Sequence, residues 1–326
     1  MDLSKLTKKS LDSRGLTYTY YTSSASGSKP TLVLLHGWPD NAQLWAGLIN
    51  NFLIPRGYGV VALDNLGYGE TSKPTDPKLY AWNHLTSDVI RILDAEGLDT
   101  VISVGHDWGS FLCQRLYNFY PNRVRGLVTV SIAYSPPTTA FNLDMANRVT
   151  KDIYGYGLLE YWHFFTADDG ARLKNENLES VYAVAFGDPL TWRQNFCSPG
   201  GMRRFISEGR TQPTLPFATS QHKEEFMRRF GKDGFEGPCC WYKAQTFGVQ
   251  NEADALVADN AKVLVPVLYW GGQDDQVCKP EALQPSINAG LLPEVTSKVR
   301  EGGHWALLEN PVEFGQDVLS WLEKHF

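Results

Sequence analysis

The stretch that decides the fold is TVISVGHDWG, at residues 100–109. A mainly apolar run and then a glycine-flanked turn at residues 105–109 predict a buried strand that leads through a sharp bend into a helix. The glycines leave room for a strained bend, with the side chain of Asp107 exposed at its apex above the edge of a sheet. This pattern is typical of a nucleophile elbow, in which serine is the usual residue at the apex.

An aspartate at this apex indicates a particular chemistry. A serine hydroxyl must lose a proton before it attacks, whereas a carboxylate with a pKa near its reference value of about 3.9 is already anionic at neutral pH. A carboxylate suits displacement at a saturated carbon, which leaves an alkyl ester on the enzyme, better than attack on an ester or amide. Asp107 therefore favours an epoxide or an alkyl halide as the substrate.

The composition is ordinary for a soluble globular enzyme, with 326 residues of which 43% are hydrophobic and 20% charged. The formal net charge is −6, and no cluster of Lys or Arg predicts a nucleic-acid surface. No apolar run approaches the roughly 20 residues that a membrane span needs, and the first residues lack the apolar core of a signal peptide. The five cysteines fit no metal-ligand spacing. We expect a cytoplasmic protein without cofactor or metal, and the sequence indicates no oligomeric state.

Strand and helix patterns alternate in the first third and the last fifth of the chain. Short continuous apolar runs at residues 31–35 and 60–63 predict strands buried on both faces, and further strands are predicted at 100–103, 126–132 and 263–269. A further strand is predicted at residues 295–299, and apolar residues at helical spacing predict helices at 82–95 and after Pro311. This alternation predicts an α/β fold with a mostly parallel sheet flanked by helices.

The middle of the chain breaks this rhythm. It opens with Pro136 and Pro137, contains no clear strand pattern, and has aromatic-rich helical fragments between Gly/Pro stretches such as residues 198–201. We therefore predict a core domain formed by residues 1–135 and 259–326. Residues 136–258 are predicted to form a helical cap inserted between two strands of the sheet.

Reactive side chains follow three further predicted strands. The sequence HGWP at residues 36–39 follows the first, GGQDD at 271–275 follows a later one, and GGHW at 302–305 follows the last. Ligands of open α/β sheets bind beyond the carboxyl ends of the strands, where these loops meet. The chain order of nucleophile, acid and histidine is that of the catalytic triad on such a sheet.

Together these motifs resemble those of the epoxide hydrolases of the α/β-hydrolase fold, of the soluble kind that carries a helical cap. The resemblance covers nearly the whole chain after about residue 15. The motifs that carry it are HGWP at 36–39, DNLGYG at 64–69, GHDWG at 105–109, WYK at 241–243 and GHW at 303–305. Each pattern is weak alone, but in this order and at strand ends they are specific.

The resemblance implies a two-step reaction. Asp107 attacks an epoxide carbon, and His304, oriented by a carboxylate, takes a proton from the water that hydrolyses the resulting ester. The backbone N–H groups of Trp38 and Trp108 correspond to the oxyanion hole of the family, with a cis bond between Trp38 and Pro39. The implied partners are water and a small apolar epoxide, and the product is a vicinal diol.

The resemblance also implies two tyrosines of the cap as acids, because the alkoxide released by an opening epoxide needs a proton. Tyr242, within CWYK at residues 240–243, matches one of them. Tyr161 is the best match to the other, with Tyr154 and Tyr156 close by in the sequence.

Two neighbouring aspartates are candidates for the carboxylate that orients His304. Asp275 has the family's spacing from the acid to the proline at position 280, whereas counting from Trp270 would select Asp274. We favour Asp275 on this spacing.

Two other functions share parts of this pattern. A haloalkane dehalogenase has the same aspartate nucleophile, but such enzymes commonly carry an asparagine at the position of Trp38, and a departing halide needs no acid such as Tyr242. A ligand receptor of the same fold is the second alternative, since fold alone decides no function. Asp107 and His304 with a nearby acid argue against a loss of catalysis. The many aromatic residues at 154–165 and 196–247 favour an apolar substrate.

Overall fold

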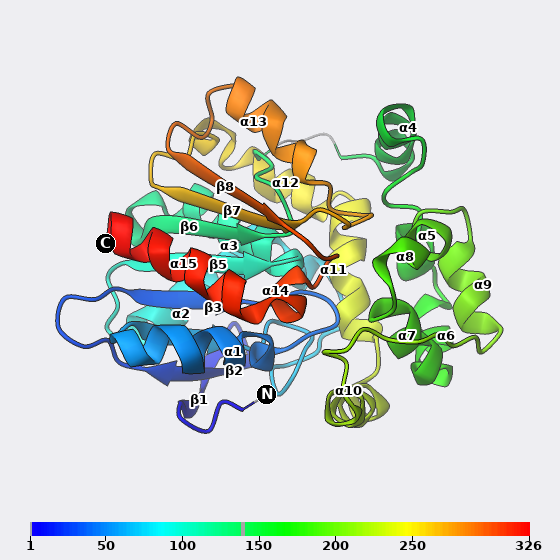
Figure 1. Cartoon of the computed structure of the whole chain (residues 1–326), viewed down its shortest axis with the longest axis horizontal. Coiled ribbons are helices and arrows are strands. Elements are labelled where there is room, and N and C mark those ends of the chain that lie inside the picture. The colour runs from blue at the N-terminus through cyan, green and yellow to red at the C-terminus, as the bar shows by residue number, and fades with distance from the viewer. Residues whose placement is uncertain (1, 138–140) are drawn as a thin grey trace.

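The computed structural model of the chain describes residues 2–137 and 141–326. At its centre is one eight-stranded sheet (Figure 1). Its strands are β1 (Thr7–Ser13), β2 (Leu16–Ser23), β3 (Thr31–Leu35), β4 (Gly59–Leu63), β5 (Val101–His106), β6 (Val124–Val130), β7 (Val267–Gly272) and β8 (Val295–Arg300). They lie in the order β1-β2-β4-β3-β5-β6-β7-β8. Only the pairs β1–β2 and β2–β4 are antiparallel, which confirms the mostly parallel sheet predicted from the sequence.

The strand predictions for β3, β4 and β5 agree with the structure to within a few residues at each end. Every residue of these strands is buried, so each appears in the sequence as a mainly apolar run. The prediction of a strand at residues 263–269 was wrong at its start, because Pro266 has no N–H to donate and the strand begins after it. The predicted strand at 126–132 ends at Val130 in the structure, because Ser131 has a φ of 67° that breaks the extended backbone.

Helices cover both faces of the sheet. On the one face lie α1 (Ala46–Leu48) and α15 (Pro311–His325), and on the other α2 (Trp82–Ala95) and α3 (Trp108–Phe119) (Figure 1). Two short helices, α13 (Gln284–Asn288) and α14 (Ala306–Glu309), lie near the C-terminal strands. The helices predicted at 82–95 and after Pro311 are thereby confirmed.

All remaining α-helices in the described residues come between β6 and β7. They are α4 (Leu143–Tyr154), α5 (Trp162–Thr166), α6 (Gly170–Glu176), α7 (Leu178–Ala185), α8 (Pro189–Asn195), α9 (Gly201–Ser207), α10 (Ser220–Asp233), α11 (Glu236–Thr246) and α12 (Val249–Ala255). The helices α4 to α10 gather beyond one end of the sheet, and α11 runs between them and the strands (Figure 1). Helix α12 packs against α2 of the sheet layer. The division at residues 136 and 258 into core and cap therefore stays a prediction.

Within the described residues, no helix combines the length and the apolar character that crossing a membrane requires.

Candidate active site

Asp107 lies at the sharp bend between β5 and α3, with φ of 53° and ψ of −125°. A positive φ is uncommon for a residue with a side chain, so this backbone is strained. The flanking glycines are needed for close contacts: a Cβ on Gly105 would overlap the backbone of Gly109, and one on Gly109 would overlap that of Leu35. The bend predicted from GHDWG is therefore present.

Two backbone N–H groups approach the Asp107 carboxylate. The N–H of Trp38 donates to Asp107 Oδ1 at 2.9 Å, and the bond between Trp38 and Pro39 is cis, as the resemblance implies. Burial raises the pKa of Asp107, but the hydrogen bond and charge of His304 and the N–H of Trp108 lower it by more, so the pKa lies below its ordinary value. Asp107 is thus held as a carboxylate, the form that can attack carbon.

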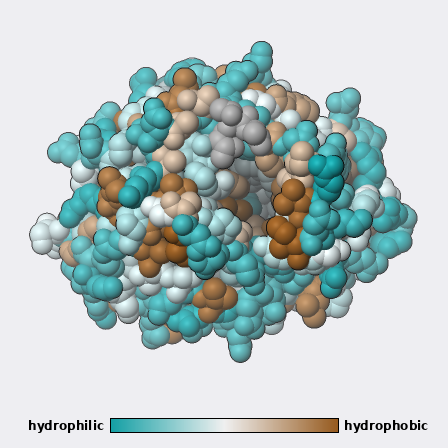
Figure 2. Space-filling view, turned by 90° about the horizontal axis from the view of Figure 1, so that it is seen from above, coloured by the Kyte–Doolittle hydropathy of each residue, from teal (hydrophilic) through white to brown (hydrophobic). Residues whose placement is uncertain are grey.

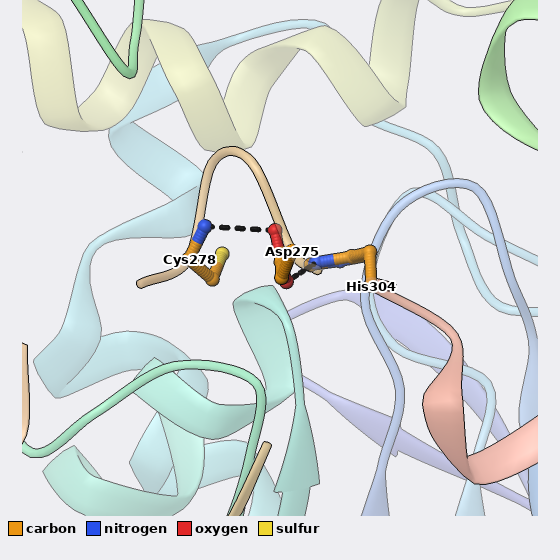
Figure 3. A group of neighbouring side chains, drawn as sticks. All are labelled: Asp275, Cys278 and His304. Atoms are coloured by element: carbon orange, nitrogen blue, oxygen red, sulfur yellow. Dashed lines mark hydrogen bonds and ion pairs between the residues drawn. The ribbon is translucent and has the colours of Figure 1, made fainter. Parts of the chain in front are cut away.

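His304 lies between two carboxylates. Its Nδ1 is 2.7 Å from Asp275 Oδ2, and its Nε2 is 3.6 Å from Asp107 Oδ2. The other oxygen of Asp275 accepts the backbone N–H groups of Val277 and Cys278, each at 2.9 Å. Figure 3 shows the contacts of Asp275 with Cys278 and with His304. The structure therefore brings Asp275 to His304.

Asp274 has a different environment from its neighbour. The backbone N–H of Asp274 donates to the carbonyl oxygen of Gly302 at 2.9 Å. Asp274 is partly exposed, whereas Asp275 is fully buried. The family spacing thus selects the aspartate that contacts His304, and the count from Trp270 selects the one whose backbone N–H contacts the loop at Gly302.

The protonation of His304 depends on these carboxylates. Burial alone lowers the pKa of His304, but the charge of Asp275 and the hydrogen bonds with Asp107 and Asp275 raise it well above the ordinary value. Loss of either negative charge would therefore lower the pKa of His304.

Two further histidines support the loops around the site. His36 Nε2 accepts the backbone N–H of Asn65 at 2.9 Å, and burial lowers the pKa of His36 to about 3. His106 Nε2 is 2.9 Å from the backbone oxygen of His304, and burial lowers the pKa of His106 to about 4. Both rings are neutral at pH 7, and both contact the backbone of neighbouring loops.

The two tyrosines implied by the resemblance are neighbours. Tyr161 directly precedes α5 and Tyr242 lies on α11, with their ring centroids 6.0 Å apart. The ring of Tyr242 also packs edge-on against Trp108, with centroids 5.0 Å apart. Burial raises the pKa of both tyrosines well above the ordinary value, and the negative charge of Asp107 adds to this effect, so both hydroxyls stay protonated as they would in water.

A cavity of about 450 Å³ opens beside Asp107 and is lined mostly by apolar side chains. On the face that carries α4 and α13, the surface is hollowed and hydrophobic side chains flank the hollow (Figure 2). The described lining includes Tyr161, but neither Tyr154 nor Tyr156 nor Tyr242. Tyr156 instead donates its hydroxyl to Gln276 at 2.8 Å. Of Tyr154, Tyr156 and Tyr161, therefore, Tyr161 is the one that lines the cavity.

Cys278 is a residue of the site that sequence reasoning missed. It lines the cavity, and with Asp275 and His304 it forms a group whose potential ligand atoms lie within 4.8 Å of one another (Figure 3). Both oxygens of Asp275 already accept hydrogen bonds, so this group offers no ready set of metal ligands. The sequence signal that could have identified Cys278 is its position three residues after Asp275, in the turn that follows β7. All five cysteines are free thiols.

Several proteins with sequences similar to this chain are named epoxide hydrolases. The mouse protein bifunctional epoxide hydrolase 2 is 27% identical over 303 residues, which cover 91% of this chain and 52% of the mouse protein. This chain thus spans about half the length of the mammalian relatives it matches. Epoxide hydrolase srdG of Neurospora crassa is 28% identical over 341 residues, covering 96% of this chain and 94% of the fungal protein.

Solved structures agree with the fold. Epoxide hydrolase A from Mycobacterium thermoresistibile superposes with a TM-score of 0.81 at 23% identity, covering 98% of each chain. Potato epoxide hydrolase I superposes with a TM-score of 0.78 at 25% identity, covering 98% of this chain and 99% of the potato protein. Residues 30–311 match the model of the α/β-hydrolase fold, and this chain therefore belongs to the α/β-hydrolase-fold family.

Proposed function

We propose that this protein is an epoxide hydrolase that converts an apolar epoxide to a vicinal diol. The observation that carries this proposal is the carboxylate of Asp107 at the elbow, with the Trp38 N–H on one oxygen and His304 near the other. The names of the relatives from mouse, Neurospora crassa and potato support it.

In the first step, a carboxylate oxygen of Asp107 attacks an epoxide carbon and the carbon–oxygen bond of the ring breaks. The bond that forms is an alkyl ester, and the released oxygen needs a proton. Tyr161 and Tyr242 are the proposed donors because of their position: Tyr161 lines the cavity together with Asp107, and the ring of Tyr242 packs against Trp108. Positioned acids contribute roughly 10²–10⁴ in rate.

In the second step, the ester changes the state of His304. Conversion of Asp107 to a neutral ester removes one of the two negative charges that hold the pKa of His304 high. A neutral imidazole oriented by Asp275 can then take a proton from water, which attacks the carbonyl carbon of the ester.

The oxyanion that forms in this second step needs donors. Trp38 N–H already donates to Asp107 Oδ1, and the N–H of Trp108 is the second proposed donor. Each such donor contributes about 3–4 kcal/mol to lowering the barrier. When the intermediate collapses, the bond from the carbonyl carbon to the substrate oxygen breaks, and the proton held by His304 passes to that oxygen to complete the diol. The proton left on Asp107 then restores the tyrosine that acted as acid and regenerates the Asp107 carboxylate.

We also propose a substrate class, a cellular compartment and a cap for this reaction. The mostly apolar cavity supports an apolar substrate, and water is the only co-reactant that the scheme requires. Five free thiols support a reducing compartment, and we propose the cytoplasm. We also propose that residues 136–258 act as the cap, since Tyr161 and Tyr242 come from this segment.

The test is to incubate the purified protein with styrene oxide and, separately, with 1-bromobutane. We expect diol from the first and no bromide from the second, and Asp107→Ala should form no diol while retaining its circular dichroism spectrum. In a single turnover in heavy-oxygen water, the peptide that carries Asp107 should gain the isotope, because water attacks its carbonyl carbon. Bromide without diol would indicate a dehalogenase and contradict the proposal.

A further inference from the structure

The cavity beside Asp107 follows one face of α3. Trp108, Phe111 and Arg115 all line it, and their spacing of three and four residues places them on the same side of the helix. Eight residues separate Asp107 from Arg115, which is about 12 Å along the helix axis at 1.5 Å per residue. The cavity thus extends from the nucleophile to a charged side chain two turns away.

The wall between these two ends is apolar. It is formed by Phe111 from α3, by Ile132 and Ala133 after β6, and by Leu158 and Trp162 from the segment between β6 and β7. An apolar chain or ring system would bury these side chains without leaving a polar group unsatisfied.

The far end is polar but its charges are paired. Arg115 is 3% exposed and Asp254, on α12, is 4% exposed. Nε and Nη2 of Arg115 donate to the two oxygens of Asp254 at 2.6 and 3.0 Å, and Nη1 donates to the backbone oxygen of Ser135 at 2.8 Å. A guanidinium held in this way presents a balanced charge to the cavity, not a free cation.

Two neutral residues of the cavity lining keep hydrogen-bonding capacity for a ligand, and one of them, Ser135, adjoins Arg115. The Ser135 hydroxyl and the Gln245 side-chain amide, on α11, both line the cavity, and neither forms a hydrogen bond with another residue in the described ranges. Each of these groups can donate and accept. A ligand group that matches them is itself an uncharged donor and acceptor.

We propose that the far end of this cavity, at Ser135 and Gln245 beside the Arg115–Asp254 pair, binds an uncharged hydrogen-bonding group of the substrate. The substrate is then an epoxide with an apolar body of about 12 Å that ends in a hydroxyl or amide. This inference rests on the proposed epoxide hydrolase function and names its substrate class. A carboxylate tail is disfavoured at this end, because it would lose hydration and approach the carboxylate of Asp254, while the guanidinium of Arg115 is already paired.

The test compares three epoxides on the unmodified protein. They share the reactive end and chain length and differ in the tail: 1,2-epoxydecane, 9,10-epoxydecan-1-ol and 9,10-epoxydecanoic acid. Diol formation gives kcat/KM for each. We expect the alcohol to exceed both the alkane and the acid by roughly tenfold, as two modest hydrogen bonds contribute.

A variant links this preference to the subsite. Gln245→Leu removes the amide at similar volume, and the ratio of kcat/KM for the alcohol over the alkane should fall by about threefold or more. The matched control is Gln194→Leu, on α8, where an exposed amide is removed and the ratio should stay unchanged.

Each other outcome contradicts the inference in a different way. Equal values for the three epoxides would refute the polar subsite and leave the epoxide hydrolase function intact. A preference for the acid would refute the uncharged tail, and its loss in Lys279→Met would assign the carboxylate to that ammonium at the cavity wall. No diol from any of the three would contradict the proposed function, and with it the substrate class inferred here.

Discussion

Replacing Asp275 by asparagine tests the arrangement around His304 most directly. Asp275 Oδ1 accepts two backbone N–H groups, from Val277 and Cys278, and Oδ2 contacts His304 Nδ1 at 2.7 Å. In Asp275→Asn the amide oxygen must stay on the two N–H donors, because the opposite orientation would set its NH₂ group against both. The NH₂ group then faces His304 and can only donate to Nδ1.

The consequence is a change of tautomer. A histidine that accepts at Nδ1 carries its proton on Nε2, the nitrogen that faces Asp107 and should take the proton from water. Such a swap costs about 10⁴-fold in kcat in a serine-type triad, which corresponds to about 5 kcal/mol of barrier. We expect a loss of this size in Asp275→Asn, confined to hydrolysis of the ester, because the Asp107 carboxylate is unchanged.

The assay is a rapid-quench reaction with styrene oxide, followed by mass measurement of the peptide that carries Asp107. Asp275→Asn should accumulate close to one equivalent of ester within a single turnover and then release diol slowly. Asp274→Asn is the matched control, and its kcat should stay within about twofold because its backbone N–H contact with Gly302 is kept. A kcat for Asp275→Asn within tenfold of the unmodified protein, or a larger loss in Asp274→Asn, would refute the reasoning.

Three further outcomes follow from the same site. His304→Gln should retain alkylation and accumulate ester on Asp107, seen as a stable mass increase of one substrate, and no adduct would contradict the two-step scheme. Tyr161→Phe and Tyr242→Phe should each slow ester formation by about 10²-fold in a stopped reaction, while Tyr156→Phe should leave it within about twofold. Burial raises the pKa of Asp40 from 3.8 to about 6. Between these pH values the folded protein keeps a proton that the unfolded chain has released, so rising pH lowers the free energy of unfolding by up to about 3 kcal/mol. In urea denaturation, Asp40→Asn should therefore gain stability relative to the unmodified protein from pH 4 to pH 8, and a constant difference would contradict the raised pKa.

The sequence predicts most of this fold because the central strands are buried on both faces. Burial on both faces favours apolar residues, which β3 has at every position after Thr31, and its limits were predicted without error at Thr31 and Leu35. The edge strand β1 was not predicted, because its side chains are mostly exposed and its pairing with β2 leaves no apolar run to read.

The candidate site divides in the same way. Asp107 follows the buried strand β5 and His304 follows the edge strand β8, both within glycine-rich turns, so local sequence was enough to single them out. The choice among Tyr154, Tyr156 and Tyr161 depends on which ring reaches the cavity, which only packing determines. The pairing of Arg115 with Asp254 joins residues 139 positions apart, and no local pattern indicates such a contact.

The order of the two proposed steps can be read from the charge on Asp107. In a serine triad, the histidine must be neutral before the first step, because it takes the proton of the nucleophile. An aspartate nucleophile needs no such help, so a His304 whose pKa is held high by two carboxylates is no obstacle to alkylation. The ester then removes one of those charges at the moment when a base is first required. The same carboxylate that attacks the substrate therefore also determines when His304 becomes a base, which explains why a buried histidine between two acids suits this chemistry.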